Sequence, residues 1–290
     1  MTGYLVSLLT MAAIYGVAAL GLNLQFGIAG LFNVGCVGFF AVGAYAAALL
    51  PGWLSGLLAG TAAAVVLGVL VAGLVLRLRG DTLAIATFGL AVAVQIAAVN
   101  LGRVTGGPGG IAGIVRPFGG GAGWLAVCLG VVVVAWVGLE WLDRGAWGRA
   151  LRAVSEDDEA AAAAGQNVRL LRLQAFLLGA GLTGLAGGLY AHSTGFISPQ
   201  DFLPVFTFQL YAMVIIGGSG RHAGALLGAL VVWAVWSGSG QVLGGVLPAA
   251  WQAKAGGLRV MLIATALLAM LRWRPEGLWP DLVGRRAVRW

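Results

Sequence analysis

The sequence predicts an all-α polytopic membrane protein with about nine transmembrane helices, eight to ten being compatible with it. Of its 290 residues 60% are hydrophobic and only 9% are charged, and the mean hydropathy is +0.95. Soluble globular chains carry about 25% charged residues, so this composition excludes an ordinary soluble fold. Uncharged runs that can hold at least part of a 20-residue spanning helix recur along the chain, without the alternation of a β-barrel. We expect residues 1–290 to form a single transmembrane domain.

Nine apolar segments account for the predicted spans. The segments 26–50 and 205–238 are rich in glycine, so we expect broken or re-entrant helices there. The amino-terminal run lacks a positively charged start and continues past signal length, so we expect a span rather than a cleaved signal peptide. The predicted spans are 3–20, 26–50, 54–76, 82–101, 124–141, 170–191, 205–219, 222–238 and 256–271.

The basic residues predict which ends of the spans face the cytoplasm. If the loop 143–169 is cytoplasmic, only four of the 17 basic residues, Arg103, Arg116, Lys254 and Arg259, fall on the other side. By the positive-inside rule the amino terminus is then outside and the carboxyl terminus is cytoplasmic. The net charge of +7 is explained by arginines that anchor cytoplasmic loops, and we expect no nucleic-acid partner.

The one long charged stretch of the chain covers residues 148–167, with the sequence GRALRAVSEDDEAAAAAGQN. Ser155 and Asp158 have the spacing of a capping box, and four acidic residues follow Ser155 in the first turn, where the helix dipole favours them. Five alanines come next, and Gly165 stands where a left-handed helix end is expected. The pattern predicts a short water-exposed helix from 155 to 165. So short a helix must rest on something, so it is either a plain connection between spans or a docking element.

Charges are absent from the middle of the predicted spans. Asp81, Glu140 and Asp201 fall at span edges, and Arg259 lies near the outer end of the last span. An ion-coupled or proton-coupled carrier needs an ionisable group near the membrane centre. Secondary transport is therefore an alternative that the sequence disfavours.

Catalytic and cofactor motifs are also missing from the sequence. The only histidines, His192 and His222, fall on opposite sides of the membrane in this topology, without an HExxH or Ser/His/Asp set. Cys36 and Cys128 lie within predicted spans and have no metal-ligand spacing, and the only lysine, Lys254, is not part of a phosphate-binding loop. We expect no enzyme activity, no metal site and no cofactor in this chain.

Uncharged polar residues do occur within the predicted spans. They either bond between helices or line a polar path through which a zwitterion can pass, and the sequence leaves both interpretations open. The abundant glycines leave a similar choice between close helix packing and Gly-broken helices along a path. The polar residues are Asn23, Gln25, Asn33, Gln95, Asn100 and Gln209.

Four parts of the chain resemble the LivM-type permeases of ABC importers, in the branched-chain amino-acid permease family. Their order and spacing run through most of the chain. Cys36 is a departure, because many relatives carry a histidine there, and it bears on the substrate rather than on the class. The matching stretches are GLNLQFGIAGLFNVGCVGFFAVGAY (21–45), RLRGDTLAIATFG (77–89) with TGGPGGI (105–111), the charged stretch 148–167, and GLAGGLYAHSTGFISPQDF (184–202) with GGSGRHAGALLGA (217–229).

The resemblance implies the permease subunit of an ATP-driven importer in a bacterial inner membrane. Its partners would be a second, LivH-type permease, two cytoplasmic ATPases that hold ATP and Mg²⁺, and a periplasmic binding protein that sets most of the specificity. Branched-chain amino acids are the default substrate, with other amino acids, urea, short amides and sugars as alternatives. The outer loop, with Thr105, Gly106, Gly107 and Pro108, would contact the binding protein. The coupling segment within 143–169 would dock on an ATPase through Arg149, Ser155, Glu156, Asp157, Asp158, Glu159, Ala160, Ala161 and Gly165.

Overall fold

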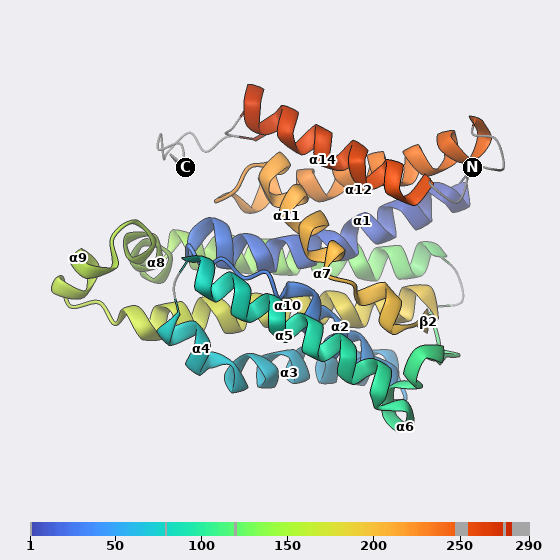
Figure 1. Ribbon diagram of the computed structural model, residues 1–290, viewed down its shortest axis with the longest axis horizontal. Coiled ribbons are helices and arrows are strands. Elements are labelled where there is room, and N and C mark those ends of the chain that lie inside the picture. The colour runs from blue at the N-terminus through green and yellow to red at the C-terminus, as the bar shows by residue number, and fades with distance from the viewer. Residues whose placement is uncertain (1, 79, 119–120, 247–254, 275–276, 280–290) are drawn as a thin grey trace.

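The computed structural model describes residues 2–78, 80–118, 121–246, 255–274 and 277–279 as a bundle of helices that run mostly along one direction (Figure 1). Within these residues six helices are long and apolar enough to cross a membrane, and three shorter apolar helices accompany them. The all-α membrane class is confirmed. Nine apolar helices of the described residues lie near the nine predicted segments, but three of them are too short to span alone, so the number of nine spans is not confirmed.

The first half of the chain contains the largest departure from the predicted spans. Helix α1 (Thr2–Leu22) does not end near residue 20 but continues as a π-helix, η1 (Asn23–Ile28). The second span does not begin at residue 26, because residues 29–35 turn and α2 (Cys36–Ala48) starts only after them. The next helices are α3 (Trp53–Leu70), α4 (Ala72–Arg77) and α5 (Gly80–Asn100). The glycine-rich early segment is thus a broken helix.

A small two-stranded antiparallel sheet lies at one end of the bundle. Helix α6 (Gly102–Thr105) and the 3₁₀ turn η2 (Gly107–Gly109) lead into β1 (Ile111–Ala112), which pairs antiparallel with β2 (Phe196–Ile197). A second 3₁₀ turn, η3 (Pro199–Phe202), follows β2 and is held by a capping box between Ser198 and Asp201. This two-stranded sheet therefore joins the outer loop at 105–111 to the loop at 195–204.

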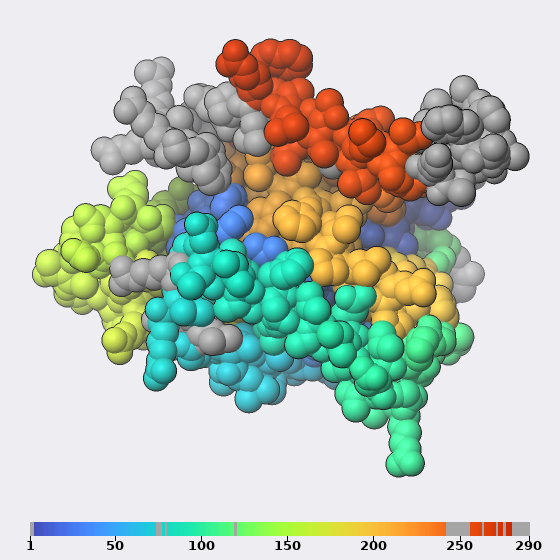
Figure 2. Space-filling model, in the orientation of Figure 1, coloured from blue at the N-terminus to red at the C-terminus, as the bar shows by residue number. Residues whose placement is uncertain are grey.

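The second half of the chain supplies the remaining helices. They are α7 (Gly121–Arg144), α8 (Ala146–Glu156), α9 (Asp158–Ala163), α10 (Val168–Thr194), α11 (Val205–Gly217), α12 (His222–Val246) and α14 (Ala255–Trp273). In Figure 1, α8 and α9 lie at one end of the bundle, whereas α6, β2 and the start of α1 lie at the other, and Figure 2 shows the yellow-green residues of α8 and α9 protruding at the left end in the same orientation. The predicted separation of the charged stretch from the outer loop is therefore confirmed.

Helix α10 packs against α1, α2 and α3, and glycines allow the backbones to approach closely. A Cβ atom placed on Gly21 would lie 2.7 Å from the carbonyl oxygen of Gly179, and one on Gly60 would lie 2.5 Å from that of Gly43. A Cβ on Gly43 would collide with the backbone of Gly184. Close packing of the small-residue kind is confirmed at these positions.

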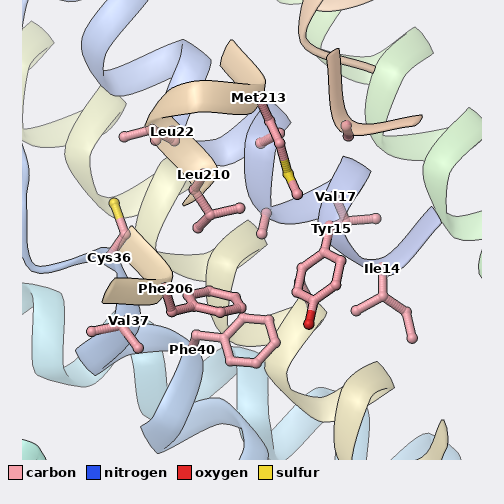
Figure 3. Packing of buried hydrophobic residues seen from close by; sticks show 14 of the residues in the cluster. Ile14, Tyr15, Val17, Leu22, Cys36, Val37, Phe40, Phe206, Leu210 and Met213 are labelled. Atoms are coloured by element: carbon pink, nitrogen blue, oxygen red, sulfur yellow. The ribbon is translucent and has the colours of Figure 1, made fainter. Parts of the chain in front are cut away.

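Aromatic side chains fill the space where α1, α2 and α11 meet. Phe206 of α11 packs against Tyr15 of α1 and Phe40 of α2, with ring centroids 5.4 Å and 4.6 Å away, and all three rings are labelled in Figure 3. All three residues are buried. This cluster holds the short helix α11 against α1 and α2, the helices on the two sides of the break.

Candidate coupling segment and the polar break it contacts

The charged stretch folds as two helices rather than as the single predicted helix. Asp157 has extended backbone angles (φ −153°, ψ 104°), which ends α8 and starts α9. Its carboxylate accepts hydrogen bonds from the amides of Glu159 and Ala160, each at 3.0 Å, and is thus the N-cap of α9. The predicted cap at Ser155 is wrong, because Ser155 already lies in the last turn of α8. Glu156 is the final residue of that helix.

The end of α9 agrees with the prediction. Gly165 has a φ of +83°, and its amide donates to the carbonyl of Ala162 at 3.0 Å. The next amide, of Gln166, reaches back to the carbonyl of Ala161 at 3.0 Å. These two bonds form the Schellman motif that closes a helix with a left-handed glycine.

The two helices present distinct buried and exposed faces. Helix α8 buries Leu151 and Val154, while Arg149 and Ser155 are exposed. Helix α9 buries Ala161, which is only 5% exposed. The exposed residues of the predicted docking set are Arg149, Ser155, Glu156, Asp157, Glu159, Ala160 and Gly165, while Asp158 is partly buried.

Arg152 attaches α8 to the membrane helices and was not singled out by the sequence. Its guanidinium donates to both carboxylate oxygens of Asp143 on α7, at 3.1 Å and 2.6 Å, and to the carbonyl of Gly220 at 3.4 Å. The Cα of Ser155 and its Cβ lie against Gly30, where an added Cβ would be 3.4 Å from the Ser155 Cβ. The coupling segment thus touches both the turn after η1 and the loop between α11 and α12.

Polar side chains gather at the break between η1 and α2, and three of the predicted residues belong to them. Gln25 donates from Nε2 to the carbonyl of Phe176 at 2.8 Å, which leaves its Oε1 to accept from Asn33 Nδ2 at 2.8 Å. The Oδ1 of Asn33 then accepts from the amide of Gly35 at 2.9 Å. Since each amide group is oriented by the next, the order of donors and acceptors is fixed.

Further groups satisfy the backbone of the same turn. The hydroxyl of Tyr211 and the thiol of Cys36 donate to the carbonyl of Asn33, at 3.0 Å and 3.2 Å. The amide of Val34 donates to the hydroxyl of Thr87 at 3.0 Å. The amide of Val37 donates in the same way to a threonine hydroxyl of α11 at 3.3 Å. Non-helical backbone is tolerated at membrane depth only when it is satisfied in this way.

Asn23 joins the break to the loop that Arg152 contacts. Its Oδ1 accepts from the amide of Gly220 at 2.9 Å, so its Nδ2 faces Nδ1 of His222 at 3.4 Å. Gly220 is therefore held from both sides, by Asn23 through its amide and by Arg152 through its carbonyl. This connects α8 with the π-helical end of α1 through two hydrogen bonds.

The other three predicted polar residues do not join this group. Asn100 is exposed and donates to the carbonyl of Ile96 in its own helix at 2.8 Å. Gln95 and Gln209 are half-buried and form no hydrogen bond within the described part of the chain. Their role along a translocation path stays a prediction, as does that of Asn23, Gln25 and Asn33.

At the opposite end, the outer loop is ordered by its own hydrogen bonds. The hydroxyl of Thr105 donates to the carbonyls of Ala98 and Leu101, at 2.6 Å and 2.9 Å. Gly106 and Pro108 are exposed, whereas Thr105 and Gly107 are buried. Of the four residues predicted to contact a binding protein, two therefore lie on the surface in this structure.

The described residues contain no group of three His, Cys, Asp or Glu side chains placed to hold a metal ion. His192 instead donates from Nδ1 to the carbonyl of Val115 at 3.0 Å, since a carbonyl can only accept. His192 lies in the last turn of α10, whereas His222 is the first residue of α12. The two histidines therefore share no site.

Comparison with known proteins gives consistent matches. The family model described as branched-chain amino acid transport system / permease component matches residues 4–271. The high-affinity branched-chain amino acid transport system permease LivM of Escherichia coli K12 is 32% identical over 95% of this chain and 70% of that protein. The probable branched-chain amino acid transport permease LivM of Methanocaldococcus jannaschii is 27% identical over 92% of this chain and 91% of that protein. The fructose import permease FrcC of Rhizobium meliloti is 38% identical over 35% of this chain and 30% of that protein. No solved structure matches.

Proposed function

Since the chain belongs to the family of branched-chain amino acid transport permease components, we propose that it is the membrane-spanning subunit of an ATP-driven importer for branched-chain or other small amino acids. A periplasmic binding protein delivers the substrate, a second permease completes the pore, and two cytoplasmic ATPases hydrolyse ATP. The family is one of transport permeases and not of enzymes, which agrees with the absence of catalytic motifs from the sequence.

The attachment of α8 to the polar break is the observation that supports this proposal most. An ATPase that presses on the exposed face of the segment moves α8, and α8 holds Gly220 through Arg152. Gly220 in turn holds Asn23 at the π-helical end of α1. Movement of α8 at the cytoplasmic end is therefore transmitted to the irregular backbone between α1 and α2. A change of conformation is easiest there, because the backbone is not helical.

The same proposal fixes the orientation. The end of the bundle that carries α8 and α9 faces the cytoplasm, and the sheet of β1 and β2 faces the periplasm together with the amino terminus. Gly106 and Pro108 then belong to the surface offered to the binding protein.

Tryptophan substitution on α9 tests the docking. Ala160 is exposed, so Ala160→Trp should leave insertion intact but prevent the ATPases from co-purifying and abolish coupled uptake. Ala122→Trp, which changes an exposed alanine at the other end of the bundle, is the control and should leave co-purification unchanged. Ala161 is unsuited to this test because it is buried, so a tryptophan there would disturb the packing of α9 itself. Undiminished co-purification of the ATPases with Ala160→Trp would reject α9 as the docking element.

Transport assays separate the alternatives. A secondary carrier would move substrate alone in liposomes under an ion gradient, whereas the proposed importer requires nucleotide and its partners. The local resemblance to a fructose import permease favours a sugar as the second substrate class, ahead of urea or short amides. Competition of labelled leucine uptake by isoleucine and valine, but not by fructose or urea, is the expected result.

A further inference from the structure

A second site lies on the side of the coupling segment that faces the membrane helices. A pocket of about 410 Å³ opens between the end of α4, helix α9 and the first turns of α10. Pockets that bind small ligands or headgroups fall in the range of about 300–1,000 Å³. Its lining residues are Arg77, Asp158, Glu159, Ala162, Val168, Arg169 and Arg172.

The charges of the pocket favour an anion. Three guanidinium groups face two carboxylates, and one of these, on Asp158, is already paired with Arg172 at 3.2 Å. Arg77 and Arg169 are exposed and have no carboxylate partner within the described residues. The Nε–H of Arg172 is buried and finds no acceptor among those residues. The pocket also lies at the amino-terminal end of the 27-residue helix α10, where the helix dipole adds partial positive charge.

The position of the pocket indicates that the anion belongs to a lipid. Arg77 is the last residue of α4, directly after the span of α3, and Arg169 is in the first turn of α10. Exposed apolar side chains lie on α3, which precedes α4, and on α10, with Leu70 at the end of α3 76% exposed and Leu170 48% exposed. A free anion makes no favourable contact with these apolar side chains. A phospholipid places its acyl chains along the apolar side chains and its phosphate among the arginines.

We propose that this pocket binds the phosphate headgroup of an anionic phospholipid from the leaflet on the side of α8 and α9. The lipid bridges Arg77 of α4 and Arg169 of α10 beside Glu159, and it leaves the exposed Ala160, which does not line the pocket, for an ATPase to contact. This binding needs neither nucleotide nor substrate and is independent of the proposed transport function.

Native mass spectrometry of the full purified chain, in whatever assembly it forms, measures the binding directly. With phosphatidylglycerol added to a zwitterionic detergent, the unmodified chain should retain a bound lipid. Arg77→Gln and Arg169→Gln should each weaken retention about fivefold, as expected for one basic residue near an anionic headgroup. Arg144→Gln is the matched control, because Arg144 lies at the same end of the bundle and pairs with Glu140 on the protein surface.

Three results would overturn the proposal. The first is equal retention of phosphatidylglycerol by Arg169→Gln and Arg144→Gln. The second is equal retention of phosphatidylcholine and phosphatidylglycerol by the unmodified chain. The third is displacement of the lipid by millimolar inorganic phosphate, which would identify a site for free anions instead. Both pocket arginines are exposed, so their replacement should leave the fold intact, and a matching elution profile checks this.

Discussion

Replacing Asn33 by leucine should open the polar break while the rest of the bundle stays folded. The side chain of Asn33 holds two groups that leucine cannot hold, the amide of Gly35 at 2.9 Å and Oε1 of Gln25 at 2.8 Å. An unsatisfied buried polar group costs about 1–3 kcal/mol, and a loop at membrane depth cannot turn to water instead. We therefore expect local opening to become easier by about 2 kcal/mol.

Cys36 provides the assay, because it is fully buried and its thiol donates to the carbonyl of Asn33 at 3.2 Å. A thiol reagent reaches it only when the break opens. With a factor of ten for every 1.4 kcal/mol, labelling of Cys36 should be about 30-fold faster in Asn33→Leu. Cys128 on α7 is buried as well and reports opening of the whole bundle. Gln95→Leu is the matched control, since Gln95 makes no hydrogen bond in the described part of the chain.

Two outcomes would refute this reasoning. If Cys36 is labelled no faster in Asn33→Leu than in Gln95→Leu, the hydrogen bonds of Asn33 do not hold the break closed. If Cys36 and Cys128 become equally reactive, the substitution unfolds the bundle instead of the break. Uptake by the assembled importer should fall with Asn33→Leu, and unchanged uptake would remove Asn33 from the translocation mechanism.

Three further predictions follow from the packing and the hydrogen bonds. Gly43→Ala should lower the free energy of unfolding by about 1–3 kcal/mol, because the new methyl group collides with the backbone of α10. Gly89→Ala is the control and should leave the free energy of unfolding unchanged, because its methyl group enters open space. Thermal unfolding in detergent compares the two variants. Asp157→Ala should destabilise α9 by about 1 kcal/mol through loss of its cap, and Ser155→Ala should have little effect, as amide exchange of α9 would show. Arg152→Gln should reduce uptake by the assembled importer at least tenfold while ATP hydrolysis continues, and proportional loss of both would contradict the transmission through Gly220.

The features that the sequence predicts correctly are those set by local composition. Uncharged runs locate the nine apolar helices because burial in lipid depends on each segment alone. Gly165 marks a helix end because a left-handed backbone is a property of one residue. The glycines of α2 and α10 indicate close packing for a similar reason, although their partners across the interface cannot be read from the sequence.

The break between η1 and α2 depends on contacts that are distant in sequence. Residues 26–50 form one glycine-rich apolar run, so the sequence predicts a broken helix there but not the position of the break. The turn exists because Thr87, Tyr211 and the backbone of Phe176 supply its hydrogen bonds from three other helices. The N-cap of α9 was missed for a related reason. Both Ser155 and Asp157 are good capping residues, and only the extension of α8 to Glu156 leaves Asp157 in that position.

The hydrogen bonds of the break constrain the transport role that is proposed for its polar side chains. Gln25 and Asn33 are fully buried, and the bonds that orient them also satisfy the backbone around Gly35. A substrate that bonds to either amide must first take it from the backbone, which in a membrane has no water to replace it. In this state the two side chains therefore hold the break closed. They become available to a zwitterion only if α2 or α10 moves, and such movement is what a push on α8 through Gly220 and Asn23 would produce. The same movement of α2 or α10 then opens the break and exposes the side-chain amides of Gln25 and Asn33.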